Sequence, residues 1–264
     1  IADNGRRLVS SDLVLDEATG HYEIDFTDFE RKIVENDVKL FLLCSPHNPV
    51  GRVWSREELL QIGAICQRHG VTVFSDEIHA DFVWQGRHQV FAAADPAFAA
   101  FTITATAPSK TFNIAGLQVS NIFIADDALR AKFRRAYNAS GYSQLNAAGL
   151  IAAEAAYRGG EVWYNAVKAY LVENIAYMRE FINTRLPQLR MIEPEGTYLV
   201  WVDFRKLGLD NGALEDLILH KAGLWLDSGA IFGPVGEGFQ RFNIACPRAT
   251  LQLALEKLEA AIIQ

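Results

Sequence analysis

Short apolar runs separated by a helical pattern constrain the fold of this chain more than any other feature. The runs cover residues 39–43, 71–74, 101–105 and 119–124. The last two runs are rich in apolar and β-branched residues, which is typical of strands in a sheet that helices cover on both faces. We therefore expect an α/β fold with a mostly parallel sheet covered by helices.

The segment between the first two runs predicts a helix. Ser55 and Glu58 form a Ser-x-x-Glu capping box, in which each side chain satisfies a backbone amide at the start of a helix. The apolar spacing continues to residue 65, and Gly70 ends the pattern. A strand, a helix and a strand joined by short links form a βαβ unit, in which the strands are parallel and the connection is right-handed.

The rest of the chain predicts a change of architecture. Helices are expected at residues 128–137, 144–157 and 162–186. The last quarter predicts four elements: a half-exposed strand at 197–204, a helix at 213–221, a strand at 240–244 and a closing helix at 251–263. We therefore expect a large domain over residues 1–160 and a smaller α+β C-terminal domain, with the interdomain helix, over residues 161–264.

Composition narrows the classes of protein that this chain can represent. Half of its 264 residues are hydrophobic, which suffices for a substantial core, but no apolar run is long enough to span a bilayer. The net charge of −7 and the lack of a basic run argue against nucleic acid or an anionic membrane as a partner. Three widely spaced cysteines, Cys44, Cys66 and Cys246, are typical of a reduced, cytoplasmic protein.

Polar residues follow the first three predicted strands. Asn48, Asp76 and Lys110 each come after the end of one strand, and ligands of open parallel sheets bind beyond these carboxyl ends. Pyridoxal phosphate (PLP) requires a lysine to form an imine, a carboxylate opposite the ring nitrogen and a donor to the ring oxygen. Taken singly, each residue also has a structural explanation. Lys110 could form a salt bridge at the rim of the sheet, Asp76 could cap a helix and Asn48 could form a turn.

Four motifs give the chain a specific resemblance. They are Ser-Pro-His-Asn-Pro-Val-Gly-Arg at residues 45–52, Ser-Asp-Glu-Ile-His-Ala-Asp at 75–81, Ser-Lys-Thr-Phe-Asn-Ile-Ala-Gly-Leu at 109–117 and Arg-Phe-Asn-Ile-Ala-Cys-Pro-Arg at 241–248. In this order they resemble fold-type I PLP-dependent enzymes of the class I/II aminotransferase superfamily. His79 stands where ordinary class I aminotransferases usually carry tyrosine, and this resembles the MalY/PatB cystathionine β-lyase (C–S lyase) branch.

The resemblance implies roles for individual residues. Lys110 would form the imine with PLP, and Asp76 would face the pyridine nitrogen. Asn48 would contact the ring oxygen, with His79 nearby. Ser109 would bind the phosphate, and the large domain would be the PLP-binding one.

The resemblance also implies a substrate site and partners. Arg248 would hold the substrate's α-carboxylate, a task suited to the guanidinium fork. The substrate would be a small sulfur-containing amino acid, and the enzyme a homodimer. A metal site is not expected: His69, His79, Asp81 and His88 lack the spacing of a known metal motif.

Three functions stay open on the sequence alone. The first is a PLP-dependent carbon–sulfur β-lyase that converts cystathionine or cysteine into a thiol, pyruvate and ammonia. The second is a PLP-dependent aminotransferase, and the third is a non-catalytic fragment or regulatory binding protein. The third arises because the family has a longer N-terminal segment before the position of Ile1, so we expect this chain to lack it.

Overall fold

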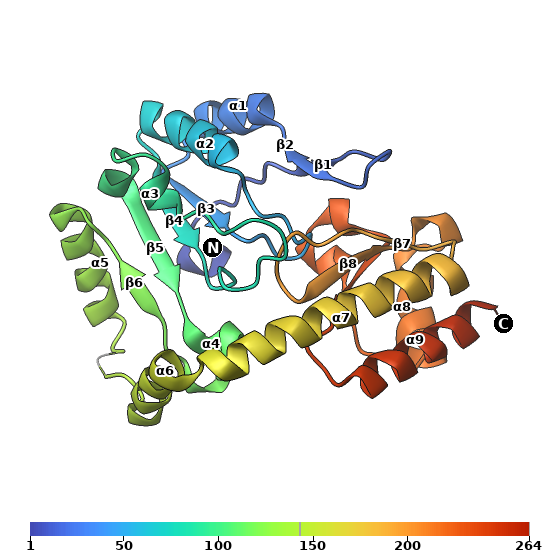
Figure 1. Ribbon diagram of the computed structural model, residues 1–264. Coiled ribbons are helices and arrows are strands. Elements are labelled where there is room, and N and C mark those ends of the chain that lie inside the picture. Colours follow the sequence, from blue (N-terminus) through green and yellow to red (C-terminus); the bar gives the residue numbers. More distant parts are fainter. Residues whose placement is uncertain (143, 264) are drawn as a thin grey trace. The chain divides into compact units, whose positions relative to one another are not determined.

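The computed structural model describes residues 1–142 and 144–263, which belong to two compact units (Figure 1). Unit 1 comprises Ile1–Pro46 and Val53–Glu161, and unit 2 comprises His47–Arg52 and Val162–Gln264. The chain thus leaves unit 1 and returns to it just after the first predicted strand. Asn48 consequently belongs to unit 2, although it lies within the predicted domain 1–160.

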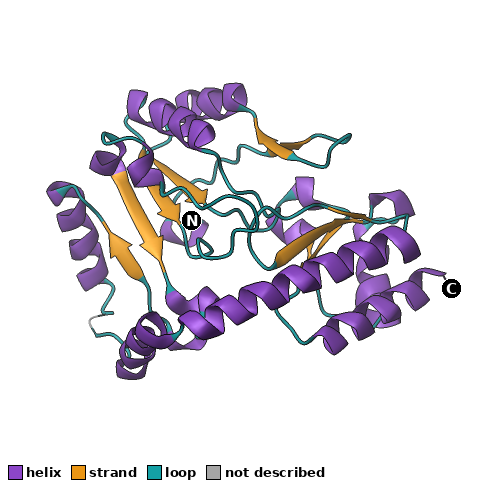
Figure 2. Ribbon diagram, in the orientation of Figure 1, coloured by secondary structure: helices purple, strands orange, loops and turns teal. Residues whose placement is uncertain are grey.

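A four-stranded sheet organises unit 1 (Figure 2). Its strands follow the order β3 (Leu40–Cys44), β4 (Thr72–Asp76), β5 (Thr102–Thr106) and β6 (Asn121–Phe123). The first three strands are parallel, and β6 is antiparallel to β5. The predicted α/β class with a mostly parallel sheet is confirmed, and each of the four apolar runs overlaps a strand.

Two helices cover one face of this sheet. Helices α1 (Phe26–Asn36) and α2 (Arg56–Arg68) share an apolar core with β3 and β4. The predicted capping box is present, because the Glu58 N–H donates to Ser55 Oγ and the Ser55 N–H donates to Glu58 Oε2. Local sequence rules therefore fix the start of α2, and burial of its apolar side fixes its position on the sheet.

The opposite face of β3 is less covered than the sequence predicts. Leu40 and Leu42 are 51% and 49% exposed. Alternate side chains of a strand point to opposite faces, so Leu43 reaches the core that α1 and α2 cover whereas these two leucines do not. The expectation that helices cover both faces is therefore wrong for β3 in the described part of the chain.

The last strand of the sheet also differs from the prediction. Phe123 of β6 is 59% exposed and Ile122 is 37% exposed, although their run was expected to be buried. Among the residues that the structure describes, strand β6 has a neighbour on one side only and runs antiparallel to it. An edge position explains why an apolar run can form a strand and still meet solvent.

Smaller elements complete unit 1. They are the hairpin of β1 (Leu13–Leu15) and β2 (Tyr22–Ile24), and the helices α3 (Phe91–Ala94), α4 (Pro108–Thr111), α5 (Asp127–Ala139) and α6 (Ala147–Gly159). The predicted helices at 128–137 and 144–157 correspond to α5 and α6. The sequence-based predictions do not include the hairpin or α1.

The described residues of unit 2 form an antiparallel sheet and α-helices, as predicted for an α+β domain. The strand order is β7 (Arg190–Met191), β8 (Leu199–Asp203), β10 (Phe239–Asn243) and β9 (Asp227–Ser228). The helices are α7 (Glu161–Arg185), α8 (Asn211–Asp216) and α9 (Arg248–Ile263), and a π-helical turn extends α8 over Leu217–Lys221.

The predicted half-exposed strand at 197–204 is fully buried instead. Every residue of β8 is buried, including Asp203. The reason is its position between β7 and β10 in the sheet. Among the described residues, no helix is long and apolar enough to cross a membrane.

Candidate active site

Asp76 is the last residue of β4, and its backbone is held from both neighbouring strands. In the sheet register it lies beside Cys44 of β3 and Ala105 of β5. The Ser45 N–H donates to the Asp76 carbonyl over 2.9 Å, and the Glu77 N–H donates to the Ala105 carbonyl over 2.8 Å. The position of the carboxylate at the end of the strand is therefore fixed by the sheet itself.

The electrostatics of Asp76 link it to Lys110. Burial raises the pKa of the Asp76 carboxyl, while the Ile78 N–H, which donates to Oδ1 over 3.2 Å, and the charge of Lys110 act to lower it. The neighbouring charge of Glu77 raises it further. A partly buried carboxylate in this position is stabilised in its ionised form by any additional positive charge beside it.

Lys110 lies in α4, the single helical turn that follows β5. Ala107 is extended and Pro108 opens the turn, a position where proline costs no hydrogen bond. Lys110 and Ser109 are both partly buried. Lys110 Nζ makes no hydrogen bond or ion pair with another residue within 1–142 or 144–263.

The turn after β4 carries His79. This side chain is 4% exposed, and the Phe82 N–H donates to its carbonyl over 3.0 Å. The preceding Glu77 is also buried and accepts from Ser75 Oγ and the Phe91 N–H, while its other oxygen lies 2.8 Å from His88 Nε2. These bonds hold the loop that leaves the sheet at Asp76.

Asn48 is positioned within unit 2 by a residue far away in sequence. Its Oδ1 accepts a hydrogen bond of 2.8 Å from Nη1 of Arg241. Arginine can only donate, so this bond identifies the oxygen of the amide, and the amide group that Asn48 can offer to a ring oxygen is its Nδ2 donor.

The segment around Asn48 needs its glycine. The Gly51 carbonyl accepts from the N–H groups of Glu195 and Gly196, at 2.9 Å each. A Cβ on Gly51 would lie 3.1 Å from Pro194, and its φ of +78° is unfavourable for other residues. The glycine of the Asn-Pro-x-Gly motif therefore permits this close approach.

Arg241 is a candidate that the sequence-based predictions missed. Besides Asn48 it forms an ion pair with Asp227, and its guanidinium lies 5.2 Å from the ring centroid of Phe232. The available signal was its place at the start of the Arg-Phe-Asn-Ile-Ala-Cys-Pro-Arg motif, from which only Arg248 was selected.

Arg248, the predicted carboxylate ligand, is held by helix α7. Its Nε donates to Asn174 Oδ1 over 2.7 Å, and its guanidinium lies 4.8 Å from the ring centroid of Tyr177. Its backbone N–H donates to the Tyr170 hydroxyl over 2.5 Å. Nη2 is buried and has no hydrogen-bond partner among the described residues.

The predicted site residues thus fall into two groups. Asp76, His79, Ser109 and Lys110 belong to unit 1, where they follow the ends of two adjacent parallel strands. Asn48 and Arg248 belong to unit 2.

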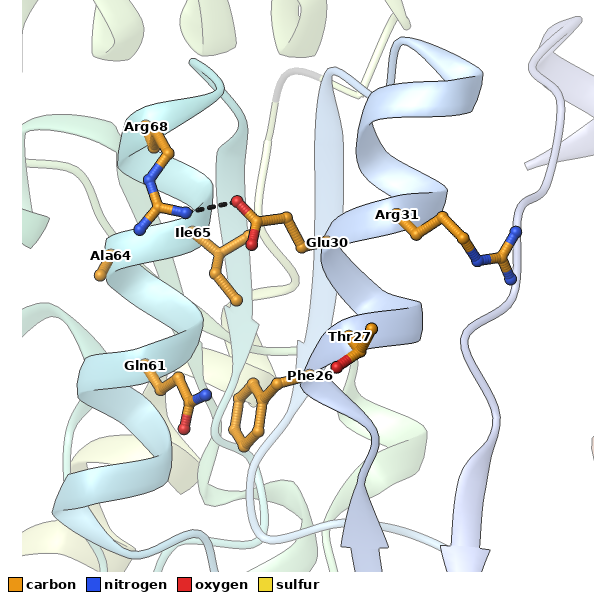
Figure 3. A pocket seen from close by; sticks show the side chains of 8 residues that line it. All are labelled: Phe26, Thr27, Glu30, Arg31, Gln61, Ala64, Ile65 and Arg68. Carbon is orange, nitrogen blue, oxygen red and sulfur yellow. Dashed lines mark hydrogen bonds and ion pairs between the residues drawn. The ribbon is translucent and has the colours of Figure 1, made fainter.

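A cavity of about 380 Å³ lies elsewhere on unit 1, between α1 and α2 (Figure 3). Phe26 and Ile65 contribute apolar surface to it, and Glu30 and Arg68 form an ion pair between the two helices. None of the predicted site residues lines this cavity. The described residues contain no group of three His, Cys, Asp or Glu side chains that could hold a metal ion.

Comparison with known proteins assigns the family. Residues 12–258 match the model of aminotransferase class I and II. The chain belongs to this family. It is 44% identical over 263 residues to cystathionine beta-lyase PatB of Bacillus subtilis and 33% identical over 262 residues to protein MalY of Escherichia coli. Each match covers 99% of this chain and 67% of the relative.

A solved relative shows the same fold with the cofactor. Cystalysin from Treponema denticola, whose crystal structure contains pyridoxal 5′-phosphate, matches with a TM-score of 0.96 and 38% identity. The match covers all of this chain and 66% of that protein. The predicted membership of the MalY/PatB branch is confirmed, as is PLP as the cofactor of the family.

The residues of unit 1 fit PLP. Burial disfavours the charged form of Asp76, and a protonated ring nitrogen supplies the positive charge that stabilises it. Lys110 has an amine that no hydrogen bond or ion pair to a described residue occupies, as required of an amine that reacts with the aldehyde of PLP.

Proposed function

We propose that this chain is a PLP-dependent carbon–sulfur β-lyase acting on cystathionine, cysteine or a related sulfur-containing amino acid. The observation that carries this proposal is the pairing of Asp76 and Lys110 at the ends of adjacent strands, with the charge of Lys110 acting on the partly buried carboxylate. The sequence-based prediction of this activity agrees with the 44% identity to cystathionine beta-lyase PatB.

The proposed chemistry assigns each residue a task. PLP, when bound, supplies a ring that accepts the electron pair left when the substrate's Cα–H bond breaks. Asp76 would face the ring nitrogen and would stabilise its proton through opposite charge. Lys110 Nζ takes the Cα proton as general base. The thiolate then leaves from Cβ, and water converts the remaining enamine into pyruvate and ammonia.

Two arginines of unit 2 are candidates for binding the substrate's α-carboxylate. Arg248 is the residue that the family resemblance implies, and its buried Nη2 has no hydrogen-bond partner among described residues. Arg241 contacts Asn48, the proposed ligand of the ring oxygen. We favour Arg241, because its contact with Asn48 relates it to the cofactor, whereas Asn174 and Tyr177 already surround Arg248.

The remaining assignments are also proposals. Ser109 neighbours Lys110 in α4 and offers a hydroxyl for the phosphate, and buried His79 lies in the turn that follows Asp76. A homodimer and a cytoplasmic location stay predictions from the family resemblance and the cysteine pattern. Light scattering of the purified chain measures the first directly.

Product analysis tests the proposed function. The chain, supplied with PLP and L-cystathionine, should release pyruvate and a thiol in equal amounts without any added keto acid. Transfer of the amino group to a keto acid without pyruvate would instead identify an aminotransferase. Absence of both reactions in a chain that has bound PLP would overturn the proposal of a lyase.

A further inference from the structure

A hydrogen bond in unit 1 joins the two segments that carry the proposed catalytic groups. Thr111 Oγ1 donates to Asp81 Oδ2 over 2.6 Å, across 30 positions of sequence. Asp81 ends the motif that begins with Ser75 and contains Asp76 and His79, whereas Thr111 directly follows Lys110. The bond therefore connects the loop after β4 to the turn after β5.

This bond matters because α4 is only one turn long. The Phe112 N–H donates to the Pro108 carbonyl and the Ile114 N–H to the Ser109 carbonyl, at 2.9 and 3.0 Å. Both bonds close the turn upon itself and do not connect it to the loop after β4. Within 1–142 and 144–263, the bond from Thr111 to Asp81 is the single hydrogen bond made by a side chain of α4.

The burial of Thr111 and the carboxylate acceptor of Asp81 make the loss of this hydrogen bond more costly. Thr111 is 3% exposed, and a hydroxyl buried to this degree loses its hydrogen bonds to water. A carboxylate is a stronger acceptor than a neutral group. Removing the Asp81 acceptor leaves the buried Thr111 hydroxyl without this bond, and removing the hydroxyl breaks the link to the loop, so either change allows the turn to shift.

We propose that Asp81 is a positioning residue for Lys110. Asp81 accepts a hydrogen bond from the Thr111 hydroxyl and thereby holds α4 in the orientation from which Lys110 Nζ reaches the substrate's Cα proton. Asp81 acts through Thr111 and takes no proton itself. The inference rests on the proposed function, because it is that function which makes Lys110 the base.

Paired variants test the proposal. Thr111→Val and Asp81→Ala remove the donor and the acceptor, whereas Thr111→Ser and Asp81→Asn retain them. Thr102→Val is the matched control: Thr102 is also buried in unit 1 and donates to the Phe98 carbonyl over 2.7 Å, but at the start of β5.

The kinetic result expected is a selective loss of turnover. Thr111→Val and Asp81→Ala should each lower kcat about tenfold and leave KM within about twofold, as expected for loss of one hydrogen bond to a charged group. The double variant should be no slower than either single one, because both remove the same bond. Thr111→Ser and Asp81→Asn should stay within about threefold of wild type, and Thr102→Val should keep its kcat.

Amide hydrogen exchange gives a readout that does not depend on activity. In the chain without cofactor, the amides of Phe112 and Ile114 should exchange about tenfold faster in Thr111→Val and Asp81→Ala than in wild type or Thr102→Val. Unchanged exchange, additive losses in the double variant or an equal loss in Thr102→Val would overturn the inference. A wild-type chain that releases no pyruvate would refute the proposed function instead, and the exchange experiment would still decide whether Asp81 holds α4.

Discussion

The imidazole of His47 should make the stability of this protein depend on pH in the mildly acidic range. His47 directly precedes Asn48, and although part of the residue reaches the surface, Nδ1 of its ring is buried. Burial, together with the charge of Arg52, lowers the pKa of His47 from 6.5 to about 4. The folded protein therefore holds this ring in its neutral form.

The sign of the effect follows from proton linkage. The unfolded chain binds a proton at His47 below pH 6.5, whereas the folded chain does so only below about pH 4. As far as His47 is concerned, the free energy of unfolding is therefore highest above pH 6.5 and decreases as the pH falls towards 4. At about 1.4 kcal/mol per pKa unit, protonation of His47 should lower the free energy of unfolding by about 2.5 kcal/mol between pH 7.5 and 4.5.

A comparison of two variants isolates this contribution. Urea denaturation at pH 7.5 and 4.5 should show that wild type loses about 2.5 kcal/mol more than His47→Gln, because the glutamine cannot be protonated. His21→Gln, which removes an exposed imidazole, should follow wild type. Equal losses in wild type and His47→Gln would refute the argument that burial keeps this histidine neutral.

Four further substitutions test other parts of the account. Asp76→Asn removes the charge proposed to face the ring nitrogen and should lower kcat about a hundredfold or more, as expected for removing one partner of a partly buried ion pair, measured by pyruvate release. Asn174→Ala should lower the free energy of unfolding by about 3 kcal/mol in urea denaturation, because it leaves Arg248 Nε and the carbonyls of Ile244 and Cys246 without their partner. Arg241→Lys should raise KM for cystathionine about tenfold while Arg248→Lys changes it less than about threefold; the reverse pattern would assign the carboxylate to Arg248.

Local rules account for the parts of the fold that the sequence predicts well. The capping box of Ser55 and Glu58 satisfies the first amides of α2 without help from any other element. Helix α1 carries similar signals that the predictions did not use. Asp25 caps its N-terminus, and Phe29 and Ile33 lie one turn apart on its buried face.

Neighbouring strands determine what local rules cannot. The direction of β6 depends on its pairing with β5, and the burial of β8 depends on its place between β7 and β10. An apolar run or an alternating pattern contains no information about how many neighbours the strand acquires. For this reason the exposure of Phe123 and the burial of Asp203 both differed from expectation.

In the candidate site, too, local motifs predict some features and contacts between distant segments determine others. Lys110 and Asp76 could be found because each lies at or shortly after the end of a recognisable strand, within a motif. The contact between Asn48 and Arg241 spans 193 positions, and the one between Asp81 and Thr111 spans 30. Such bonds depend on which loops come into contact when the chain folds. Motifs that are read one segment at a time therefore did not predict them.

The most direct test of the central claim is the attachment of PLP to Lys110. Borohydride reduction of the protein with PLP, followed by digestion and mass spectrometry, should find the cofactor on the peptide that contains Lys110. Lys110→Arg should show no such adduct and no pyruvate release, since arginine keeps the charge without a reactive amine. Modification of a different lysine, or pyruvate release by Lys110→Arg at the wild-type rate, would contradict the account.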